Sequence, residues 1–510
     1  MSSSSSKRVH LTNECYQEVF KHLLNDKDSL YSCLFVSRTF CKWIVPLLWS
    51  HPFTLLPIKH SDKLIRTYVS CLSEREKSSF REFESVEGFH NAKRPLFDYV
   101  SLLRELDYYG FYTAISQWAQ LDILTDFVIN KLILTFVRRG KHIRSLNWYH
   151  NNARVELPNL LKFPGETLSK VKYLRCGGSS AEDNTYRQLL KISNVTELEI
   201  QDYRKSNERN LAAFIRSQNS LRHLTYRSIY GGTWRLVAAL RSQAQSLRTI
   251  KFMDVSFTDV TLRGLVGCNN LEVLEFFSCH GIDVDRFWKP IVENSDFRLK
   301  KLSLVQVSVL PEAIEKIITQ ANERLVEVIV DREVTDRIPQ FIEILTDHCP
   351  NISYIKIFLR GAEKIKLLFS RITSSKLKKL VIRTNGVDAT EILPSLSKLV
   401  PLSLHQLDMD VRISPNSLQS FLNNCEAPIK TLIMTFGRVG DEHMEVLMKY
   451  ALERKSLKSF GFMYESGWGE MKVSEEVENR AREIFDLPNF FDPNDFYFHY
   501  SDNDADDSGW

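Results

Sequence analysis

The chain has 510 residues, of which 43% are apolar and 25% are charged, and its formal net charge is +4 at pH 7. This length exceeds one ordinary globular core, so several domains or a repeat array are expected. The small net charge gives no reason to expect a polyelectrolyte partner for the whole surface.

The N-terminal stretch "MSSSSSKRVH" lacks the apolar middle of a signal peptide, and no apolar run reaches the roughly 18–20 residues of a membrane span. Nine cysteines are scattered without any Cys-x-x-Cys pair. Such a set indicates reduced thiols in an intracellular protein, located in the cytoplasm, the nucleus or both. We therefore expect no disulfide, no metal and no cofactor, and we expect residues 1–8 to be disordered.

Residues 9–53 contain three apolar, helix-like runs. Cys15, Val19 and Leu23 fall at positions i, i+4 and i+8, so they share one face of a first helix. Asp28 is a suitable N-cap for a second helix. Three short helices of this kind can present apolar side chains that a helix of a partner completes.

The letters that characterise this unit are the opening "LTNE", the helix "VFKHL", the run "CLFVSRTFCKWI" and the closing "LLW". Together they resemble an F-box, with Thr12 in place of the proline that family members usually have. The resemblance implies binding to the Skp adaptor, which ties F-box proteins to a cullin–RING ubiquitin ligase. The alternative is that these helices only cap the repeats that follow. The residues expected to carry adaptor binding are Leu11, Val19, Leu23, Leu30, Leu34 and Val36, with Trp49 packing the last turn.

A helical linker is expected over residues 54–98, and repeats are expected over residues 99–485. The pattern apolar-x-x-apolar-x-apolar occurs thirteen times between "IRSLNW" at Ile143 and "LKSFGF" at Leu457. The resulting period of about 26 residues lies within the roughly 20–29 residues of leucine-rich repeats. The stretch "LLRELDYYG", which begins at Leu102, fits an earlier and irregular copy.

A helical stretch precedes most of these short strands, as in "PQFIEILTDHC", where Phe341, Ile342 and Leu345 form one apolar stripe. The strand and the stripe face one interior, and stacking of neighbouring copies buries both. This region resembles the leucine-rich-repeat family, although a regular Asn or Cys after the strand is lacking. The expected fold class is α/β: a small α-helical F-box, then a curved solenoid with parallel strands on the concave side and helices on the convex side. A generic α/β protein with parallel strands is the alternative.

The positions between the apolar letters, and the one after them, are expected on the concave face. Basic residues outnumber acidic ones there by 15 to 8, whereas the whole chain has 67 basic and 63 acidic residues. We therefore expect this face to hold an acidic or phosphorylated protein segment, which Arg binds through its planar fork. A solvated face of mixed charge is the alternative. The residues expected to bind substrate are Arg222, Arg227, Arg248, Lys251, Lys356, Lys378, Lys379 and Arg383.

The chain lacks the nucleotide loop Gly-x-x-x-x-Gly-Lys-Ser/Thr, His-Glu-x-x-His and Gly-x-Ser-x-Gly, so we expect no enzyme activity in it. The resemblances imply a substrate-recognition adaptor of an SCF-type cullin–RING E3 ubiquitin ligase, with a protein substrate on the repeats. The alternative is a non-catalytic leucine-rich-repeat scaffold or signalling protein. A nucleic-acid reader needs a stronger basic stripe with exposed aromatics. The acidic tail, residues 486–510, is expected to be disordered.

Overall fold

The computed structural model describes residues 12–23, 26–55, 61–84, 86, 89, 94–120, 126–140, 142–150, 163, 165–178, 187–202, 208–228, 233–331, 338–372, 376–434, 440–463, 473–485 and 489–491. The chain divides into two compact units, Met1–Tyr230 and Gly231–Trp510. None of the helices in the described ranges has the length and apolar character that a membrane crossing requires.

The first unit begins with four helices, of which the first three surround a small apolar core. They are α1 (Asn13–His22), α2 (Lys27–Cys33), α3 (Arg38–Leu48) and α4 (Pro52–Leu55). The side chain of Asp26 accepts the backbone N–H of Ser29 at the start of α2, so Asp26, rather than Asp28, is the N-cap. Ser37 caps α3 in the same way through the N–H of Phe40.

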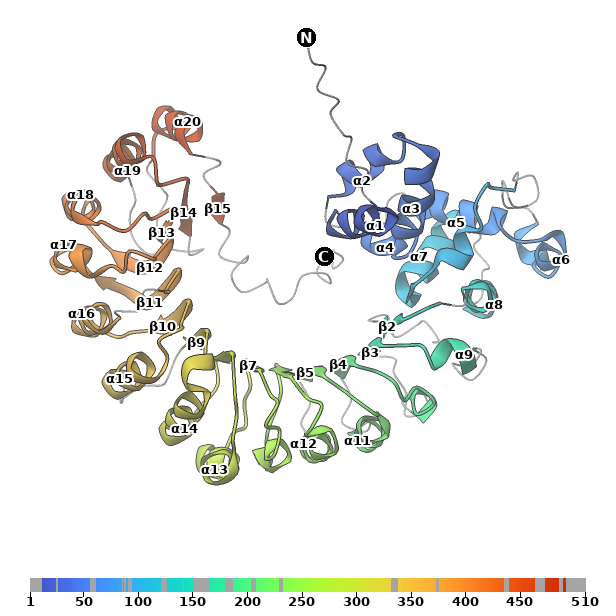
Figure 1. Ribbon diagram of the computed structural model, residues 1–510, viewed down its shortest axis with the longest axis horizontal. Helices are drawn as coiled ribbons and strands as arrows, with labels where there is room; N and C mark the ends of the chain where they lie inside the picture. Colours follow the sequence, from blue (N-terminus) through green and yellow to red (C-terminus); the bar gives the residue numbers. More distant parts are fainter. Residues whose placement is uncertain are drawn as a thin grey trace, which may run out of the picture. The chain divides into compact units, whose positions relative to one another are not determined.

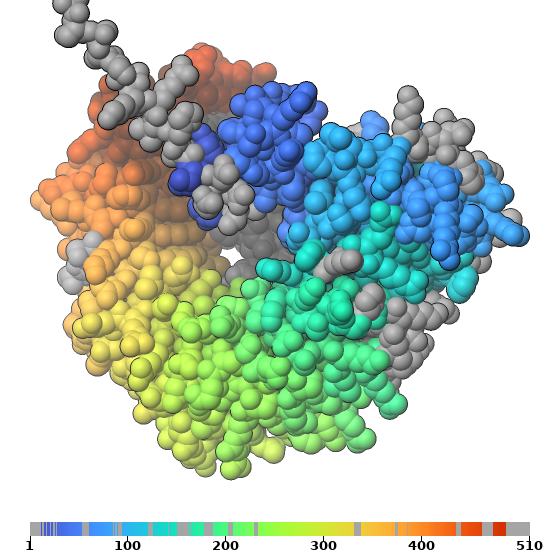
Figure 2. Space-filling model, turned by 45° about the vertical axis from the view of Figure 1, so that its right-hand side comes forward, coloured from blue at the N-terminus to red at the C-terminus, as the bar shows by residue number. Residues whose placement is uncertain are grey.

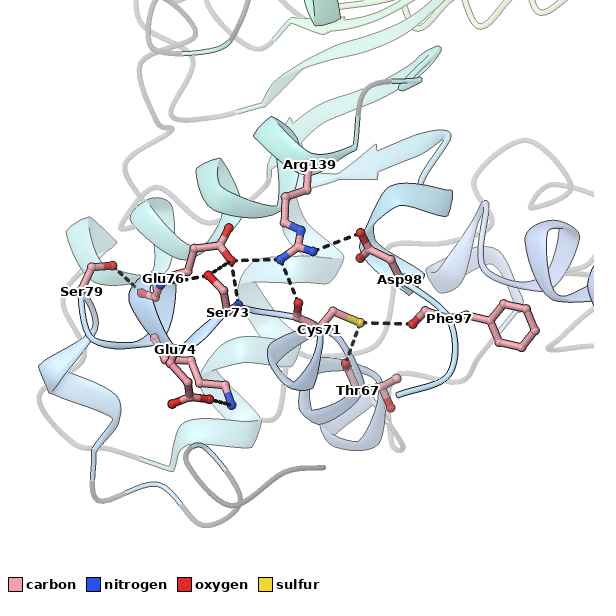
Figure 3. A network of polar contacts seen from close by, with 10 residues as sticks. Thr67, Cys71, Ser73, Glu74, Glu76, Ser79, Phe97, Asp98 and Arg139 are labelled. Carbon is pink, nitrogen blue, oxygen red and sulfur yellow. Dashed lines mark hydrogen bonds and ion pairs between the residues drawn. The ribbon is translucent and has the colours of Figure 1, made fainter. Parts of the chain in front are cut away.

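A second group of helices follows and is tied together by polar contacts around Arg139. These elements are α5 (Ser61–Ser70), α6 (Glu74–Lys77), η2 (Arg81–Phe83), η3 (Tyr99–Leu102), α7 (Tyr108–Ala119) and α8 (Asp126–Arg139). From the end of α8, the Arg139 guanidinium donates to the carbonyl of Cys71 at 2.8 Å and to the carboxylates of Glu76 at 3.0 Å and Asp98 at 3.1 Å (Figure 3). One side chain therefore joins the loop after α5, helix α6 and the segment before η3.

The repeats of the first unit pair in parallel, each strand with the strand that follows it in the chain. Leu146, Leu174, Leu198 and Leu224 are aligned in register and buried. The elements are β1 (Glu105–Asp107), β2 (Ser145–His150), α9 (Gly165–Leu168), β3 (Tyr173–Gly178), β4 (Glu197–Asp202), α11 (Glu208–Ser217) and β5 (His223–Arg227).

The second unit continues the same repeat, and its strands also pair in parallel in chain order. Its strands are β6 (Thr249–Met253), β7 (Val273–Phe277), β8 (Lys301–Val305), β9 (Glu327–Asp331), β10 (Tyr354–Phe358), β11 (Lys379–Asp388), β12 (Gln406–Arg412), β13 (Thr431–Met434), β14 (Ser459–Met463) and β15 (Asn489–Phe491). Its helices are α12 (Trp234–Leu240), η6 (Arg241–Gln243), η7 (Leu262–Leu265), α13 (Val284–Asn294), α14 (Pro311–Ala321), η8 (Asn322–Arg324), α15 (Ile338–His348), α16 (Ala362–Arg371), α17 (Leu393–Leu396), η9 (Ser397–Leu399), α18 (Pro415–Asn424), α19 (Asp441–Arg454) and α20 (Glu475–Ile484).

Within the second unit the strands form the concave face and the helices lie on the convex face (Figure 1). On the surface of this unit the colours pass from green to orange in sequence order without mixing (Figure 2), so each repeat packs against its neighbours in the chain. This is the expected α/β solenoid of leucine-rich-repeat type, and the prediction of the fold class is confirmed.

All thirteen strands predicted from the apolar pattern are present as β2–β14, and each begins two residues after the first apolar letter of its copy. The irregular copy near Leu102 supplies β1, which pairs with β2. In place of a regular Asn, the residue after the strand takes a left-handed backbone at Asp254, Ser278 and Gln306, with φ of 53°, 49° and 51°. The N–H of Ser278 bonds to the carbonyl of Val305 in the next repeat.

The end of the chain differs in part from the sequence expectation. We predicted disorder from residue 486, whereas Asn489–Phe491 form β15 and pair with β14. The rest of the predicted tail lies outside the described residues.

Candidate functional site

The N-terminal helices pack around Phe20, Leu30 and Ile44, with Leu23 and Leu34 partly buried against them. The Phe20 and Phe40 rings meet edge to face with centroids 5.0 Å apart. Leu30, predicted to contact the adaptor, is fully buried in this core, and its side chain stabilises it.

The opposite situation holds at α2 and the turn after it. Tyr31 is 61% exposed, Phe35 75% and Val36 64%, and the Tyr31 and Phe35 rings lie 5.4 Å apart. We call these three residues the α2 apolar patch. Val19, on α1, is 50% exposed. The structure thus leaves Val19 and Val36 accessible, as adaptor binding would require.

The sequence prediction missed Tyr31 and Phe35. Tyr31 comes directly after the buried Leu30, and Phe35 comes directly after the partly buried Leu34. Both aromatic residues therefore lie on the stripe next to the core stripe of the helix and turn. Two aromatic residues at spacing i, i+4 beside a core stripe were the signal for a second, exposed apolar surface. Leu11, which was predicted to contact the adaptor, lies outside the described residues.

The end of this helical group covers the first strand of the repeats. The carbonyl of Ser50 accepts the backbone N–H groups of Arg104 at 3.0 Å and Glu105 at 3.1 Å. The Trp49 ring lies 4.1 Å from that of Tyr99 and 5.5 Å from that of Tyr68, measured between centroids. Trp49 therefore packs the last turn against the residues that follow, and Ser50 caps the edge of β1.

The predicted substrate-binding residues fall into two groups. Arg227, Lys251, Lys356, Lys379 and Arg383 lie within strands, whereas Arg222, Arg248 and Lys378 stand immediately before a strand, at its N-terminal end. The sequence pattern predicts all eight on the concave face, and the structure places the second group at the N-terminal ends of the strands.

Cations within the strands of the second unit contact acids of the neighbouring repeats. Glu275 accepts Lys251 at 3.0 Å and Lys301 at 2.9 Å, and Lys301 also reaches Glu327 at 3.4 Å. Arg383 makes a two-pronged ion pair with Asp408, at 2.7 and 2.9 Å. The excess of basic letters therefore does not translate into an open cationic face at Lys251 and Arg383.

Lys379 and Tyr354 extend this paired region. The Lys379 ammonium lies 4.7 Å from the centre of the Tyr354 ring. Burial lowers the pKa of Lys379 and raises the pKa of Tyr354 to about 12, so the tyrosine remains protonated at neutral pH.

The paired region borders a β-bulge in β11. The register with β12 shifts between Ile382 and Val387, and the Asp410 carboxylate accepts the N–H groups of Thr384 at 3.0 Å and Gly386 at 3.1 Å. A bulge interrupts the regular repeat and re-aims the neighbouring side chains. Asp410 thus holds an irregular turn beside the Arg383–Asp408 pair.

The described ranges contain no group of three His, Cys, Asp or Glu residues that could share a metal ion. The nine cysteines are free thiols, and burial raises the pKa of Cys268 and of Cys279 to about 12. A buried thiol of this kind is a weak nucleophile.

No protein-family model matches the sequence, and no curated protein sequence matches it. Several solved structures are similar. The complex of Rad7 and Elc1 in yeast aligns with a TM-score of 0.43 and 14% identity over 72% of this chain and 88% of that chain. The complex of TLR13 with ssRNA13 aligns with a TM-score of 0.38 and 15% identity over 65% of this chain and 44% of that chain. A Bacteroides fragilis protein aligns with a TM-score of 0.25 and 11% identity over 63% of this chain and 75% of that chain. The assignment of the fold rests on the strand order and the repeat register.

Proposed function

We propose that this chain is a non-catalytic substrate-recognition adaptor of an SCF-type cullin–RING ubiquitin ligase. In this proposal the N-terminal helices are an F-box that binds a Skp adaptor, and the repeats hold a protein substrate. Ubiquitin transfer is then carried out by the partners. The observation that carries the proposal is the α2 apolar patch.

The patch places three large apolar side chains within six residues of one another in contact with water. Apolar side chains that gather on a surface are typical of interaction sites, whereas single exposed ones are ordinary. A helix of a partner laid across it would bury the rings and the valine together. The helices α1 to α3 are short and have a small core, so a partner that completes them also stabilises them.

A scaffold whose N-terminal helices only cap the solenoid is the second candidate, and it is favoured by the hydrogen bonds to the Ser50 carbonyl. The cap, however, uses the end of α3, whereas the exposed patch lies on α2 and the turn after it. The two roles use different residues, so capping does not account for the exposure of Phe35.

The test is a titration of the full chain with a purified Skp-family adaptor, in which calorimetry measures the dissociation constant. Burying a phenylalanine is worth about 1.5–3 kcal/mol, and three quarters of that gain remains available at Phe35, which is 75% exposed. We therefore expect Phe35→Ala to weaken the affinity for the adaptor about 6- to 40-fold. Phe127→Ala is the matched control, because Phe127 lies on α8 and is 67% exposed.

Equal affinities of the wild-type chain, Phe35→Ala and the triple variant that also carries Tyr31→Ala and Val36→Ala would refute the role of this patch. Absence of any adaptor binding by the folded wild-type chain would favour the scaffold. Leu23 and Leu34 are unsuitable positions for this test, because their partial burial in the core couples binding to folding.

A further inference from the structure

The residue immediately before each strand occupies the same place in successive repeats, and we call these positions the edge row. The carbonyl of Lys378 accepts the N–H groups of His405 at 2.9 Å and Gln406 at 3.0 Å. The carbonyls of His405 and Lys430 accept the corresponding pairs in the two repeats that follow. Side chains of the edge row therefore stand about one strand spacing, roughly 4.8 Å, apart.

In the second unit the edge row is rich in basic residues. Five of the nine positions before β6 to β14 are Lys or Arg, whereas the 67 basic residues among 510 would give about one. The single acid, Glu272, is bracketed by Arg248 at 2.6 Å and Lys300 at 2.8 Å. The nine positions are Arg248, Glu272, Lys300, Val326, Ser353, Lys378, His405, Lys430 and Lys458.

The last four positions, Lys378, His405, Lys430 and Lys458, are adjacent and contain no acid, and we call them the basic edge. All three lysines are exposed, and within the described ranges no acid or hydrogen-bond acceptor pairs with their ammonium groups. This contrasts with the paired lysines inside the strands.

The strand residues beside the basic edge do not neutralise it. The next residue in each of these repeats is Lys379, Gln406, Thr431 or Ser459, so one further cation and three neutral polar side chains border the row. The nearest acid in β12, Asp408, is buried and engaged with Arg383. Like charges held in a row repel one another, and a bound anion would relieve this repulsion.

We propose that the basic edge binds an extended, acidic segment of a partner protein, whose Asp or Glu carboxylates contact Lys378, Lys430 and Lys458. This inference rests on the proposed function, since it names the substrate class for the repeats. In an extended segment, alternate side chains lie about 6.6–6.8 Å apart, which flexible lysine stems can match across strands of roughly 4.8 Å spacing. The hydroxyls of Thr431 and Ser459 and the amide of Gln406 can bond to its backbone.

Peptide fits this row better than nucleic acid does. A single strand of nucleic acid uses aromatic side chains on which its bases stack. The residues that border the basic edge in β11 to β14 are Lys, Gln, Thr and Ser, and none is aromatic. The nearest rings are the single imidazole of His405 and Tyr354, whose face is covered by Lys379.

The experiment is fluorescence anisotropy of a labelled decapeptide of alternating Glu and Ser, titrated with the full chain at low and at physiological salt. The variant Lys378→Glu/Lys430→Glu/Lys458→Glu reverses the basic edge. The control Lys366→Glu/Lys398→Glu/Lys449→Glu makes the same charge change at exposed lysines on α16, η9 and α19 of the same region. Three exposed ion pairs together correspond to about tenfold in affinity, so we expect a loss of that size in the first variant and less than about twofold in the control.

Several results would overturn the inference: no binding of the Glu–Ser peptide, equal loss in both variants, or equal binding of a Gln–Ser peptide. If only a phosphoserine peptide binds, the group that the basic edge recognises is phosphate and the carboxylate proposal is wrong. If a ten-nucleotide thymidine strand binds more tightly than the peptide, and the first variant loses this binding, the ligand of the basic edge is nucleic acid and the peptide proposal is wrong. Adaptor binding is measured on the same preparations. If the peptide binds through the basic edge and the adaptor does not bind, the ligase proposal fails and the site remains.

Discussion

The ion pair between Arg383 and Asp408 offers the sharpest test of the energetics of the concave face. Both carboxylate oxygens are engaged, at 2.7 and 2.9 Å, and the Asp408 side chain is 1% exposed against 14% for Arg383. Asp408→Ala removes the carboxylate and leaves a guanidinium with little access to water. Removing one partner of a buried pair costs about 3–5 kcal/mol, because the remaining charge is uncompensated. We expect the free energy of unfolding of the second unit to fall by this amount.

The measurement is urea unfolding at pH 7, monitored by far-UV circular dichroism. Glu343→Ala is the control: it removes the partner of Arg371 in an ion pair whose side chains are 43% and 47% exposed. An exposed pair contributes at most about 1 kcal/mol. Arg383→Met combined with Asp408→Leu should recover most of the loss, since neither charge remains. A loss below about 1 kcal/mol in Asp408→Ala, or one equal to that of Glu343→Ala, would refute the reasoning.

Two further predictions concern stability. Burial raises the pKa of Asp107, the N-cap of α7, from 3.8 to about 6, so the stability that its neutral form contributes is present below about pH 3.8 and is lost as the pH rises through about 6. Asp107→Asn keeps the cap and should flatten this part of the thermal-unfolding profile; an unchanged slope would contradict the assignment. A Cβ at Gly264 would lie 1.9 Å from the Val237 carbonyl oxygen, so Gly264→Ala should cost about 1–3 kcal/mol in urea unfolding. Gly165→Ala, with open space around it, should leave stability within about 0.5 kcal/mol, and equal effects would disprove the steric argument.

The sequence predicts the repeats well because each copy carries its own apolar pattern. Every strand from β2 to β14 begins two residues after the first apolar letter of its copy. The apolar letters point into the core, and the alternation of side chains along the strand follows from them. The prediction needs no knowledge of the neighbouring repeat. Local rules of this kind also identify the helical stripe of α15, where Phe341, Ile342 and Leu345 are buried.

The candidate site is less predictable, because its contacts join different repeats. Lys251 meets Glu275, and Arg383 meets Asp408, across strands that lie 24 and 25 residues apart in the chain. A count of charges on one face cannot reveal this pairing. The letter pattern likewise does not show that the strand begins only at its third letter, so the sequence does not distinguish the edge row from positions within the strands.

The N-terminal helices show the same limit on a smaller scale. Apolar periodicity marks Leu30 and Leu34 as one stripe, and both are buried or partly buried. It does not say whether a second stripe faces water or a neighbouring element, and Tyr31 and Phe35 were therefore missed. Their exposure follows from the small number of helices in this group, which leaves one side of α2 uncovered.

The bond from β1 to the Ser50 carbonyl has a consequence for fragments of this protein. Parallel sheets end in strands whose free N–H groups are templates for pairing with another chain, and natural proteins cover such strands. Here the cover is a main-chain oxygen, so the residue type at position 50 matters little, whereas the presence of the preceding helix matters greatly. A fragment that starts after residue 50 exposes the N–H groups of Arg104 and Glu105, and self-association of isolated repeats is the behaviour to guard against.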